Sequence, residues 1–268
     1  MAWFQALLLG LIQGLTEFLP VSSSAHLMIL KELLGVESEG FLDFTVTVHF
    51  ATVLSTIVVF WAEILKLLKG LFKFKYNDET DYVCKIVVSM IPVALVGFLF
   101  KDQVEALFGD TLMTVAVCLL VTAGLLYFSD VFTAKVKISN SSRNGISYFQ
   151  ALVVGLGQAA AVAPGLSRSG TTIATGLISG VKRENMAQFS FLMVLAPIVG
   201  EQLLDIVKAV SKGVELSVGV GSLAIGFCAA FISGLFACKV MVSLVRRAKL
   251  GWFSIYCLIV AILIFVLA

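Results

Sequence analysis

Long apolar runs dominate the sequence, and polar segments separate them. A helix needs about 20 predominantly apolar residues to cross the hydrocarbon core of a bilayer. Six runs come close to this length and predict transmembrane helices at about 43–65, 83–100, 111–129, 187–207, 217–239 and 252–268. The segments 35–43, 66–81 and 130–145 are polar and predict connections between the spans.

Two further apolar stretches, at 3–31 and about 147–181, are interrupted by polar residues and proline. Residues 13–26 of the first are Gln-Gly-Leu-Thr-Glu-Phe-Leu-Pro-Val-Ser-Ser-Ser-Ala-His, and residues 164–172 of the second are Pro-Gly-Leu-Ser-Arg-Ser-Gly-Thr-Thr. Broken backbone at membrane depth is tolerated only inside protein or beside a cavity, and polar side chains there usually mark a functional site. We therefore predict two re-entrant helical hairpins that line a polar site.

The two halves of the chain resemble each other at an offset of 145 residues. Phe-Gln-Ala-Leu occupies residues 4–7 and again 149–152, and the same offset aligns Gly10 with Gly155 and Gln13 with Gln158. Each repeat, about 1–130 and 146–268, then holds one re-entrant hairpin and three spans, and the odd number of crossings inverts the second repeat. We predict a single all-α integral membrane domain over 1–268, an inverted-topology repeat with six full spans and a site near the midplane.

Composition supports membrane insertion. Of the 268 residues, 59% are hydrophobic and 13% are charged, and the mean hydropathy is +1.03, whereas about 25% of the residues in a soluble domain are charged. The net charge of +2 is too small to indicate a nucleic-acid partner. The five cysteines form no Cys-x-x-Cys or Cys/His pattern, which argues against a thiolate metal site.

The basic residues gather on one side of the predicted topology. Fourteen of the 19 Lys and Arg residues fall on the side opposite the N-terminus, four fall on the side of the N-terminus, and Arg168 lies within a broken stretch. Cytoplasmic loops are enriched in Lys and Arg, so we predict that both termini lie outside. If the broken stretches were full spans, the basic loops would scatter over both sides. No basic residue precedes Lys31, so the chain lacks the basic start of a signal peptide.

Arg168 is the charged residue that most strongly indicates a ligand site. Its planar guanidinium suits phosphate oxygens, and Ser167, Ser169 and Thr172 place hydroxyls beside it. A half-helix that begins here would add the positive end of its dipole. The sequence therefore predicts an anion site. A buried ion pair between Arg168 and Glu17 is a structural alternative that is compatible with this site.

In the first broken stretch, Glu17 follows Gln13 by one helical turn, so both side chains share a face. Their oxygens would suit a hard divalent cation such as Mg²⁺. His26 follows Ser23 by three residues, and a hydroxyl beside an imidazole base is a route to a covalent intermediate. His26 could also attack directly or protonate a leaving oxygen. Helix capping by the serines and a core role for His26 are the structural alternatives.

Other polar residues in the spans give weaker signals. His49 has no acid within a helical turn, so we expect it to form a hydrogen bond between helices. Glu201 and Asp205 fall near the outer end of their predicted span, where headgroup water can solvate them.

Together, the motifs at 13–26 and 164–172 closely resemble those of the bacterial undecaprenyl-diphosphatase family, also called the bacitracin-resistance family, and the resemblance covers essentially the whole chain. It implies hydrolysis of a C55 polyprenyl diphosphate lipid to the monophosphate and inorganic phosphate, which recycles the carrier of peptidoglycan synthesis. It also implies a site open to the outer face of the bacterial inner membrane and a divalent cation, Mg²⁺ or Ca²⁺. The oligomeric state is left open, with a homodimer as one candidate.

The resemblance also assigns roles to residues. It implies that Ser23 is the nucleophile, that His26 is essential and that Glu17 belongs to the catalytic and cation-binding group. Gln13, the second candidate cation ligand, stands where many members have glutamate, and Glu201 stands where many have a small uncharged residue. The implied diphosphate-binding residues are Arg168, Ser167, Ser169, Thr172 and Ser22.

Other classes of protein remain as alternatives. Inverted repeats with broken helices are the usual plan of secondary transporters, and a flippase for lipid phosphates would need the same Arg168 and hydroxyls. Ser23, His26 and Glu17 favour an enzyme, because transport needs neither a nucleophile nor a base. A membrane acid phosphatase would carry a histidine after its Ser-Arg pair, and none follows Arg168. A scaffold role explains neither polar cluster.

Overall fold

The computed structural model describes residues 1–38, 40–100, 103, 111–133, 142–163, 165–211, 218–247 and 249–267. Within these ranges the regular elements are helical. They are α1 (Trp3–Thr16), α2 (Ser23–Leu33), α3 (Phe41–Val59), α4 (Trp61–Leu71), α5 (Asp78–Leu99), α7 (Leu112–Thr133), the 3-10 helix η1 (Arg143–Gly145), α8 (Tyr148–Ala160), α9 (Arg168–Ile178), α10 (Arg183–Ser211), α11 (Val220–Arg247) and α12 (Gly251–Leu267).

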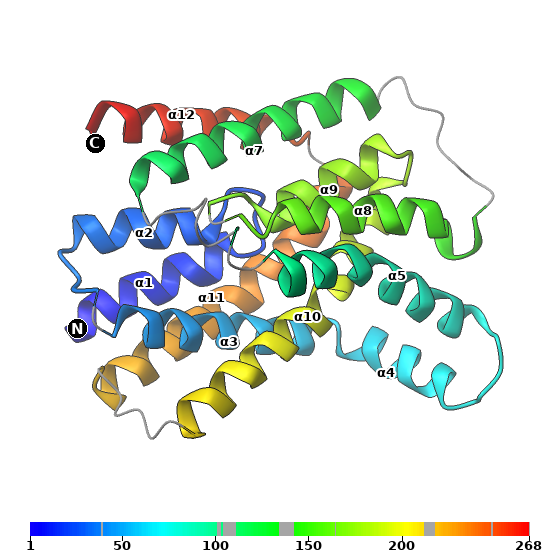
Figure 1. Ribbon diagram of the computed structural model, residues 1–268, viewed down its shortest axis with the longest axis horizontal. Helices are drawn as coiled ribbons and strands as arrows, with labels where there is room; N and C mark the ends of the chain where they lie inside the picture. The colour runs from blue at the N-terminus through cyan, green and yellow to red at the C-terminus, as the bar shows by residue number, and fades with distance from the viewer. Residues whose placement is uncertain are drawn as a thin grey trace.

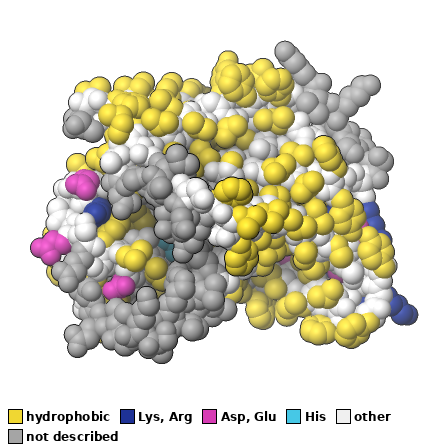
Figure 2. Space-filling view, in the orientation of Figure 1, with side chains coloured by type: hydrophobic (Ala, Val, Ile, Leu, Met, Phe, Trp, Pro, Cys, Tyr) yellow, Lys and Arg dark blue, Asp and Glu magenta, His cyan; other side chains and the backbone are white. Residues whose placement is uncertain are grey.

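Four of the described helices, α3, α5, α7 and α11, are long and apolar enough to cross a membrane. They coincide with four of the six predicted spans, and α10 and α12 cover the remaining two as helices. Figure 2 shows hydrophobic side chains over much of the visible surface, with charged groups gathered toward the two ends. The chain is therefore a multi-pass integral membrane protein.

The span predicted at 43–65 is present as α3, but it ends earlier than predicted, because the helix breaks at Phe60. α3 ends at Val59, and the separate helix α4 begins at Trp61. The Phe60 ring is buried and lies 6.0 Å from the ring of Phe191 on α10, centroid to centroid. A contact between distant segments cannot be detected from an unbroken apolar run, so the hydrophobic pattern could not predict the break at Phe60.

The predicted polar connections are shorter than expected. The segment that begins at residue 66 is helical as far as Leu71, because it belongs to α4. The next helix, α5, begins at Asp78 and is capped by Asn77, whose side chain accepts a hydrogen bond from Thr80 N at 2.7 Å. α3 begins at Phe41 and α7 continues to Thr133, while residues 134–141 lie outside the described chain. The side chains of Glu201 and Asp205 also lie outside the described part, so their predicted solvation stays a prediction.

Both interrupted stretches are broken as predicted, and both resume with a serine cap. Ser22 caps α2 by accepting a hydrogen bond from Ala25 N at 3.3 Å. Ser167 caps α9 by accepting one from Gly170 N at 3.1 Å. The caps satisfy amide groups that the bilayer interior cannot hydrate. They also direct the first turns of α2 and α9 toward the interior of the protein.

Each first half-helix packs closely on a helix that is distant in sequence. α1 contacts α11, and α8 contacts α5. A methyl group on Gly10 would collide with the carbonyl oxygen of Gly226, and one on Gly155 would collide with that of Ser89. Small residues allow such approaches between membrane helices. Because α1 and α11 come from opposite ends of the chain, this packing joins its two halves.

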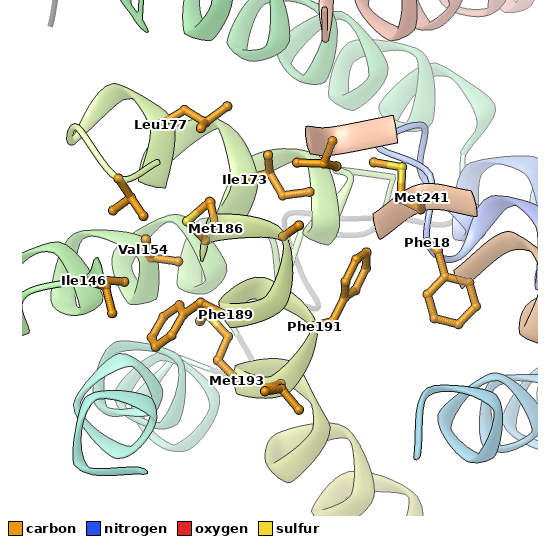
Figure 3. Close-up of a cluster of buried hydrophobic side chains, with 14 of the residues drawn as sticks. Phe18, Ile146, Val154, Ile173, Leu177, Met186, Phe189, Phe191, Met193 and Met241 are labelled. Carbon is orange, nitrogen blue, oxygen red and sulfur yellow. The ribbon is translucent and has the colours of Figure 1, made fainter. Parts of the chain in front are cut away.

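The largest buried apolar cluster surrounds α9, α10 and the middle of α11 (Figure 3). The rings of Phe18 and Phe191 meet at 5.9 Å between centroids, edge to face. Phe18 belongs to the first broken stretch, so this cluster fixes the stretch against α10. In Figure 1 both termini lie at the same end of the molecule, on the left.

A buried ion pair lies at the opposite end, where α5 begins. Lys85, which is 2% exposed, donates to Asp81 Oδ2 at 2.5 Å and to the carbonyl oxygen of Arg143 at 2.7 Å. Asp81 also accepts from Tyr76 Oη at 2.8 Å and from Asn144 Nδ2 at 2.9 Å. A buried charge pair persists only when its remaining bonding positions are filled. This network joins α5 to η1.

The close packing of α1 on α11 can be tested with one substitution. We expect Gly10→Ile to lower the free energy of unfolding by about 1–3 kcal/mol, because the side chain would be forced against α11. Thermal unfolding in detergent measures the change. Gly124→Ile is the matched control, since a methyl group at Gly124 of α7 meets nothing within 4 Å. Equal stability of the two variants would contradict the packing.

Candidate functional site

A cavity of about 200 Å³ lies where the two broken stretches meet. Its polar lining comes from both stretches, as the sequence predicts, together with His49 of α3. The sequence-predicted residues that line it are Glu17, Ser22, Ser23, Ser167, Arg168 and Ser169. The two motifs, which are more than 130 residues apart in the chain, therefore form one site.

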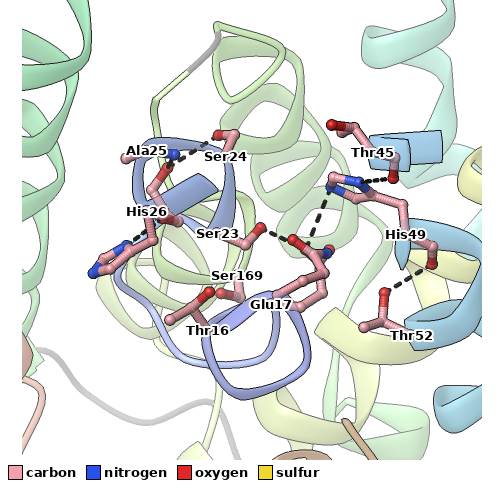
Figure 4. Close-up of polar contacts among 12 residues, drawn as sticks. Thr16, Glu17, Ser23, Ser24, Ala25, His26, Thr45, His49, Thr52 and Ser169 are labelled. Carbon is pink, nitrogen blue, oxygen red and sulfur yellow. Dashed lines mark hydrogen bonds and ion pairs between the residues drawn. The ribbon is translucent and has the colours of Figure 1, made fainter. Parts of the chain in front are cut away.

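One carboxylate oxygen, Oε2 of Glu17, holds the acidic side of the cavity together (Figure 4). Ser23 Oγ donates to it at 2.5 Å, and Gln13 Nε2 donates to it at 2.8 Å. His49 Nε2 lies 3.7 Å from the same oxygen. A hydroxyl that donates to a carboxylate can lose its proton to that carboxylate when it attacks an electrophile.

The backbone at Ser22 adopts a conformation that is unusual for a residue other than glycine. Its φ is 67° and its ψ is 97°, and α2 begins at the next residue, Ser23. A positive φ with a Cβ is strained and persists only where surrounding contacts hold it. Ser22 Oγ caps α2 and lies 3.2 Å from Ser24 Oγ, which accepts from Gly165 N at 3.3 Å. The turn that presents Ser23 is therefore bonded to the second broken stretch.

Arg168 is the first residue of α9, so its guanidinium lies beside the positive end of that helix dipole. No hydrogen bond or ion pair engages the guanidinium among the residues that the structure describes, and its side chain lines the cavity with Glu17. The alternative of a direct Arg168–Glu17 ion pair is thus absent from the described part of the chain. The free donors of Arg168 and the nearby amides suit a phosphate group.

The hydroxyls near Arg168 divide into two groups. Ser167 and Ser169 line the cavity, and Ser169 Oγ donates to the carbonyl oxygen of Leu19 at 3.0 Å, which joins the two stretches. Thr172 does not line it. The Thr172 hydroxyl is buried, lies 2.7 Å from Ser190 Oγ of α10 and donates to the carbonyl oxygen of Arg168 at 2.9 Å. This geometry does not support Thr172 as a direct phosphate ligand, because its hydroxyl is used for helix packing.

His26 lies apart from the reacting groups that the sequence predicted for it. Its Nδ1 is 2.7 Å from the carbonyl oxygen of Ser22, and its Nε2 is 2.7 Å from the hydroxyl of Tyr256 on α12. In Figure 4 the imidazole points away from Glu17. Ser23 instead bonds to Glu17. The geometry therefore does not support the predicted pair of Ser23 and His26, since both ring nitrogens already have partners.

His49 is the cavity residue that sequence reasoning missed. We expected a hydrogen bond between helices because no acidic residue lies within one helical turn of His49 in the sequence. In the structure, Glu17 approaches His49 from another segment. Nδ1 of His49 is bonded to the carbonyl oxygen of Thr45 at 2.8 Å, which aims Nε2 into the cavity. An ionisable side chain in the middle of a span is itself a signal of function, and that signal could have identified His49.

Gln13 provides a test of the predicted divalent cation. The side chain is fully buried, and its Oε1 has no hydrogen-bond partner among the described residues. An unsatisfied buried oxygen is costly, and a cation would satisfy it. The described residues contain no cluster of three or more His, Cys, Asp or Glu side chains. Gln13 now presents Nε2 to Glu17, so the pair fits a hard cation as two oxygen donors once the amide is turned over, with hydroxyls or water completing its shell.

The fold and the cavity together define a multi-pass membrane protein with a polar site that combines an acid-bonded serine with an arginine that has no hydrogen-bond or ion-pair partner among the described residues. The model of the family described as bacitracin resistance protein BacA matches residues 6–263. The chain belongs to this family.

Curated relatives align over nearly their full lengths. An undecaprenyl-diphosphatase of Bacteroides fragilis is 52% identical over 269 residues, covering 100% of this chain and 99% of its own length. One of Parabacteroides distasonis is 54% identical over 261 residues, covering 97% and 96%. One of Methanobrevibacter smithii is 39% identical over 277 residues, again covering 97% and 96%.

Proposed function

We propose that this protein hydrolyses undecaprenyl diphosphate to undecaprenyl phosphate and inorganic phosphate, and thereby recycles a lipid carrier of cell-wall synthesis and confers bacitracin resistance. The observation that carries the proposal is the hydrogen bond from Ser23 to Glu17 in the same cavity as the free guanidinium of Arg168. The names of the relatives that span the whole chain support this substrate.

In the proposed reaction, Ser23 Oγ attacks the terminal phosphorus of the diphosphate and gives its proton to Glu17. A bond forms between Ser23 Oγ and phosphorus, and the bridging phosphorus–oxygen bond breaks, so undecaprenyl phosphate leaves with the bonding electrons. After Glu17 has passed the first proton to His49, water attacks the phosphoserine and gives a proton to Glu17. The bond between Ser23 Oγ and phosphorus breaks, Ser23 Oγ takes that proton back from Glu17, and inorganic phosphate leaves. Arg168 and the first amides of α9 stabilise the charge on the transferred phosphoryl group throughout.

His49 has a supporting role in this scheme. Its Nε2 lies 3.7 Å from the Glu17 oxygen that receives the proton of Ser23. At that distance a small movement allows it to share or remove the proton, which prepares the carboxylate to activate the attacking water. The proposal gives His26 no direct part in bond making.

A divalent cation, Mg²⁺ or Ca²⁺, would be held by the Glu17 carboxylate and Gln13 Oε1. When bound, it supplies Lewis-acid neutralisation of phosphate charge. Gln13 reaches this position because it lies one helical turn before Glu17, at the end of α1.

The proposed topology is an inverted repeat of about 1–130 and 146–268 within one membrane domain, each half with a re-entrant hairpin and three spans. The reciprocal packing of α1 on α11 and of α8 on α5 supports it. So do the equivalent glycines, Gly10 and Gly155, each of which lies against a backbone carbonyl of the partner helix. Gln13 and Gln158, also 145 residues apart, both keep a buried Oε1 that has no partner in the described part of the chain.

The proposed orientation places both termini and the cavity mouth on the outer face of the bacterial inner membrane. The supporting observations are that 14 of the 19 Lys and Arg residues fall on the side of the predicted topology opposite the N-terminus, and that both termini lie at one end of the molecule in Figure 1. Positive residues favour the cytoplasmic side. A site that opens outward meets the diphosphate that extracellular polymerisation leaves behind.

A second, narrow cavity of about 40 Å³ marks a path that the lipid tail could widen and follow. It shares Glu17, Arg168 and Ser169 with the polar cavity and continues between α3 and α10. Its apolar lining consists of Phe18, Val53, Phe191, Val194, Leu195 and Ile198. A diphosphate held by Arg168 can thus keep its prenyl chain in an apolar groove that leads away from the polar cavity.

A lipid flippase is the alternative function, because inverted repeats with broken helices are also the plan of transporters. A flippase would use the Arg168 site but would have no need for the bond between Ser23 and Glu17. A Ser23→Ala variant that loses hydrolysis but still binds the lipid therefore supports the phosphatase, because a flippase would have no hydrolysis to lose.

Hydrolysis should depend on Ser23 and Arg168. We expect Ser23→Ala and Arg168→Ala each to lower the kcat for phosphate release from undecaprenyl diphosphate at least about 100-fold, since one removes the nucleophile and the other removes transition-state charge stabilisation. Purified protein in detergent provides the assay. Ser254→Ala, which removes a buried hydroxyl bonded to Ala123 O on α7, is the control with expected near-normal activity. An active Arg168→Ala variant would contradict the proposed site.

The cation requirement should depend on Gln13. We expect EDTA to abolish hydrolysis, Gln13→Glu to lower the Mg²⁺ concentration for half-maximal activity and Gln13→Leu to raise it about tenfold or more, because the variants add or remove an oxygen donor. Mg²⁺ titrations of the activity measure this. Gln158→Leu removes the equivalent buried amide of the second half and should leave the Mg²⁺ dependence unchanged. An unchanged titration of Gln13→Leu would remove Gln13 from the cation site.

The apolar groove should affect long substrates selectively. We expect Val194→Trp to raise the KM for undecaprenyl diphosphate about tenfold, while the kinetics of a five-carbon prenyl diphosphate stay unchanged, because the indole fills the groove beyond the phosphates. Val199→Trp is the control on the same helix, since Val199 does not line the cavity. Equal losses for both substrates would show that the substitution disturbs the polar site instead.

A further inference from the structure

We infer that Tyr256 is a positioning residue that acts through His26 on the strained turn presenting Ser23. The inference rests on the proposed phosphatase function. It gives His26 a role that differs from nucleophile, base or acid, and it assigns a role to a residue of α12 that lies 230 positions further along the chain.

Contacts from both sides fix the position of the His26 ring. The imidazole is buried, and its plane lies nearly parallel to the ring of Tyr256, at 4° with 5.7 Å between centroids. Nε2 is 2.7 Å from the Tyr256 hydroxyl, and Nδ1 is 2.7 Å from the carbonyl oxygen of Ser22. The ring therefore bridges α12 and the turn before α2.

The chemistry of the two partners determines the tautomer of His26. The carbonyl oxygen of Ser22 can only accept a hydrogen bond, so Nδ1 must carry a proton. In the neutral imidazole Nε2 is then an acceptor, and the Tyr256 hydroxyl donates to it. Tyr256 thereby stabilises the tautomer in which His26 holds the Ser22 carbonyl.

The Ser22 carbonyl belongs to the residue with the positive φ of 67°. The backbone N–H of His26 also donates to this carbonyl, at 3.3 Å, so His26 holds the strained residue with two donors. Strained conformations persist only where neighbouring contacts hold them. Without the imidazole, the turn would relax and carry Ser23 Oγ away from Glu17, and a displacement of about 1 Å in a reacting group can cost 100-fold in rate.

Kinetics of three variants test this role. We expect His26→Ala to lower kcat about 100-fold with little change in KM. His26→Asn should stay within about tenfold of the normal kcat, because its amide nitrogen can replace Nδ1 as the donor to Ser22. Tyr256→Phe should lower kcat about tenfold with KM unchanged, and Tyr127→Phe, an exposed tyrosine of α7, should change nothing.

Three kinetic outcomes would overturn the inference. If His26 takes part in bond making or proton transfer, His26→Asn will be as inactive as His26→Ala. If Tyr256→Phe keeps the full kcat, the hydroxyl does not support the turn. A rise in KM alone would assign both residues to substrate binding instead.

A second measurement does not depend on hydrolysis. The chain has two histidines, so a His49→Gln background leaves His26 as the single imidazole for ¹⁵N NMR of histidine-labelled protein in detergent. We expect the Nδ1–H tautomer, and a loss of its dominance when Tyr256→Phe is added. A dominant Nε2–H tautomer would overturn the inference. The tautomer is measured independently of hydrolysis. If the Nδ1–H tautomer is found in a protein that has no phosphatase activity, the proposed function is rejected but the hydrogen-bonding role of Tyr256 is not.

Discussion

The structure depends on how it satisfies backbone groups where two helices break at membrane depth. The bilayer core offers no hydrogen-bond partners, so each exposed amide or carbonyl must find one within the protein. Ser22 and Ser167 cap the second half-helices, Ser24 receives the amide of Gly165, and Ser169 donates to the Leu19 carbonyl. The last two bonds run between the broken stretches, so each break helps to satisfy the other.

The same constraint concentrates the reactive groups. Because the two breaks must meet, Arg168 at the start of α9 and Glu17 at the end of α1 line one cavity. Positive and negative groups then face a common space without a direct ion pair in the described part of the chain. Such an arrangement suits a ligand that needs a donor for its phosphates and an acceptor for a proton.

Local patterns in the sequence predicted much of this correctly. The polar motifs predicted both breaks, and the residue types predicted that Glu17, Ser23 and Arg168 would share a site, because a charge or hydroxyl within an apolar stretch must be buried with a partner. Spacing along a helix also predicted that Gln13 and Glu17 share a face, and in the structure Gln13 Nε2 donates a hydrogen bond to Glu17.

Contacts between distant segments account for what the sequence could not predict. His49 looked isolated because its acidic partner lies on α1, and the break at Phe60 depends on a ring of α10. His26 and Ser23 have the spacing of neighbours on a helix, yet the imidazole turns to Tyr256, and the Thr172 hydroxyl turns to Ser190. Helical periodicity specifies which residues share a face, but not which helix that face will contact.

The central claim of this account is that Ser23 attacks the diphosphate, and the most direct measurement is the site of phosphate on the enzyme. Protein mixed with undecaprenyl diphosphate is quenched within one turnover, in acid and separately in alkali, and analysed by peptide mass spectrometry. The account predicts phosphate on Ser23 in the acid quench. Phosphate on a histidine that survives only in alkali, or phosphate release from an enzyme that is never modified, would contradict it.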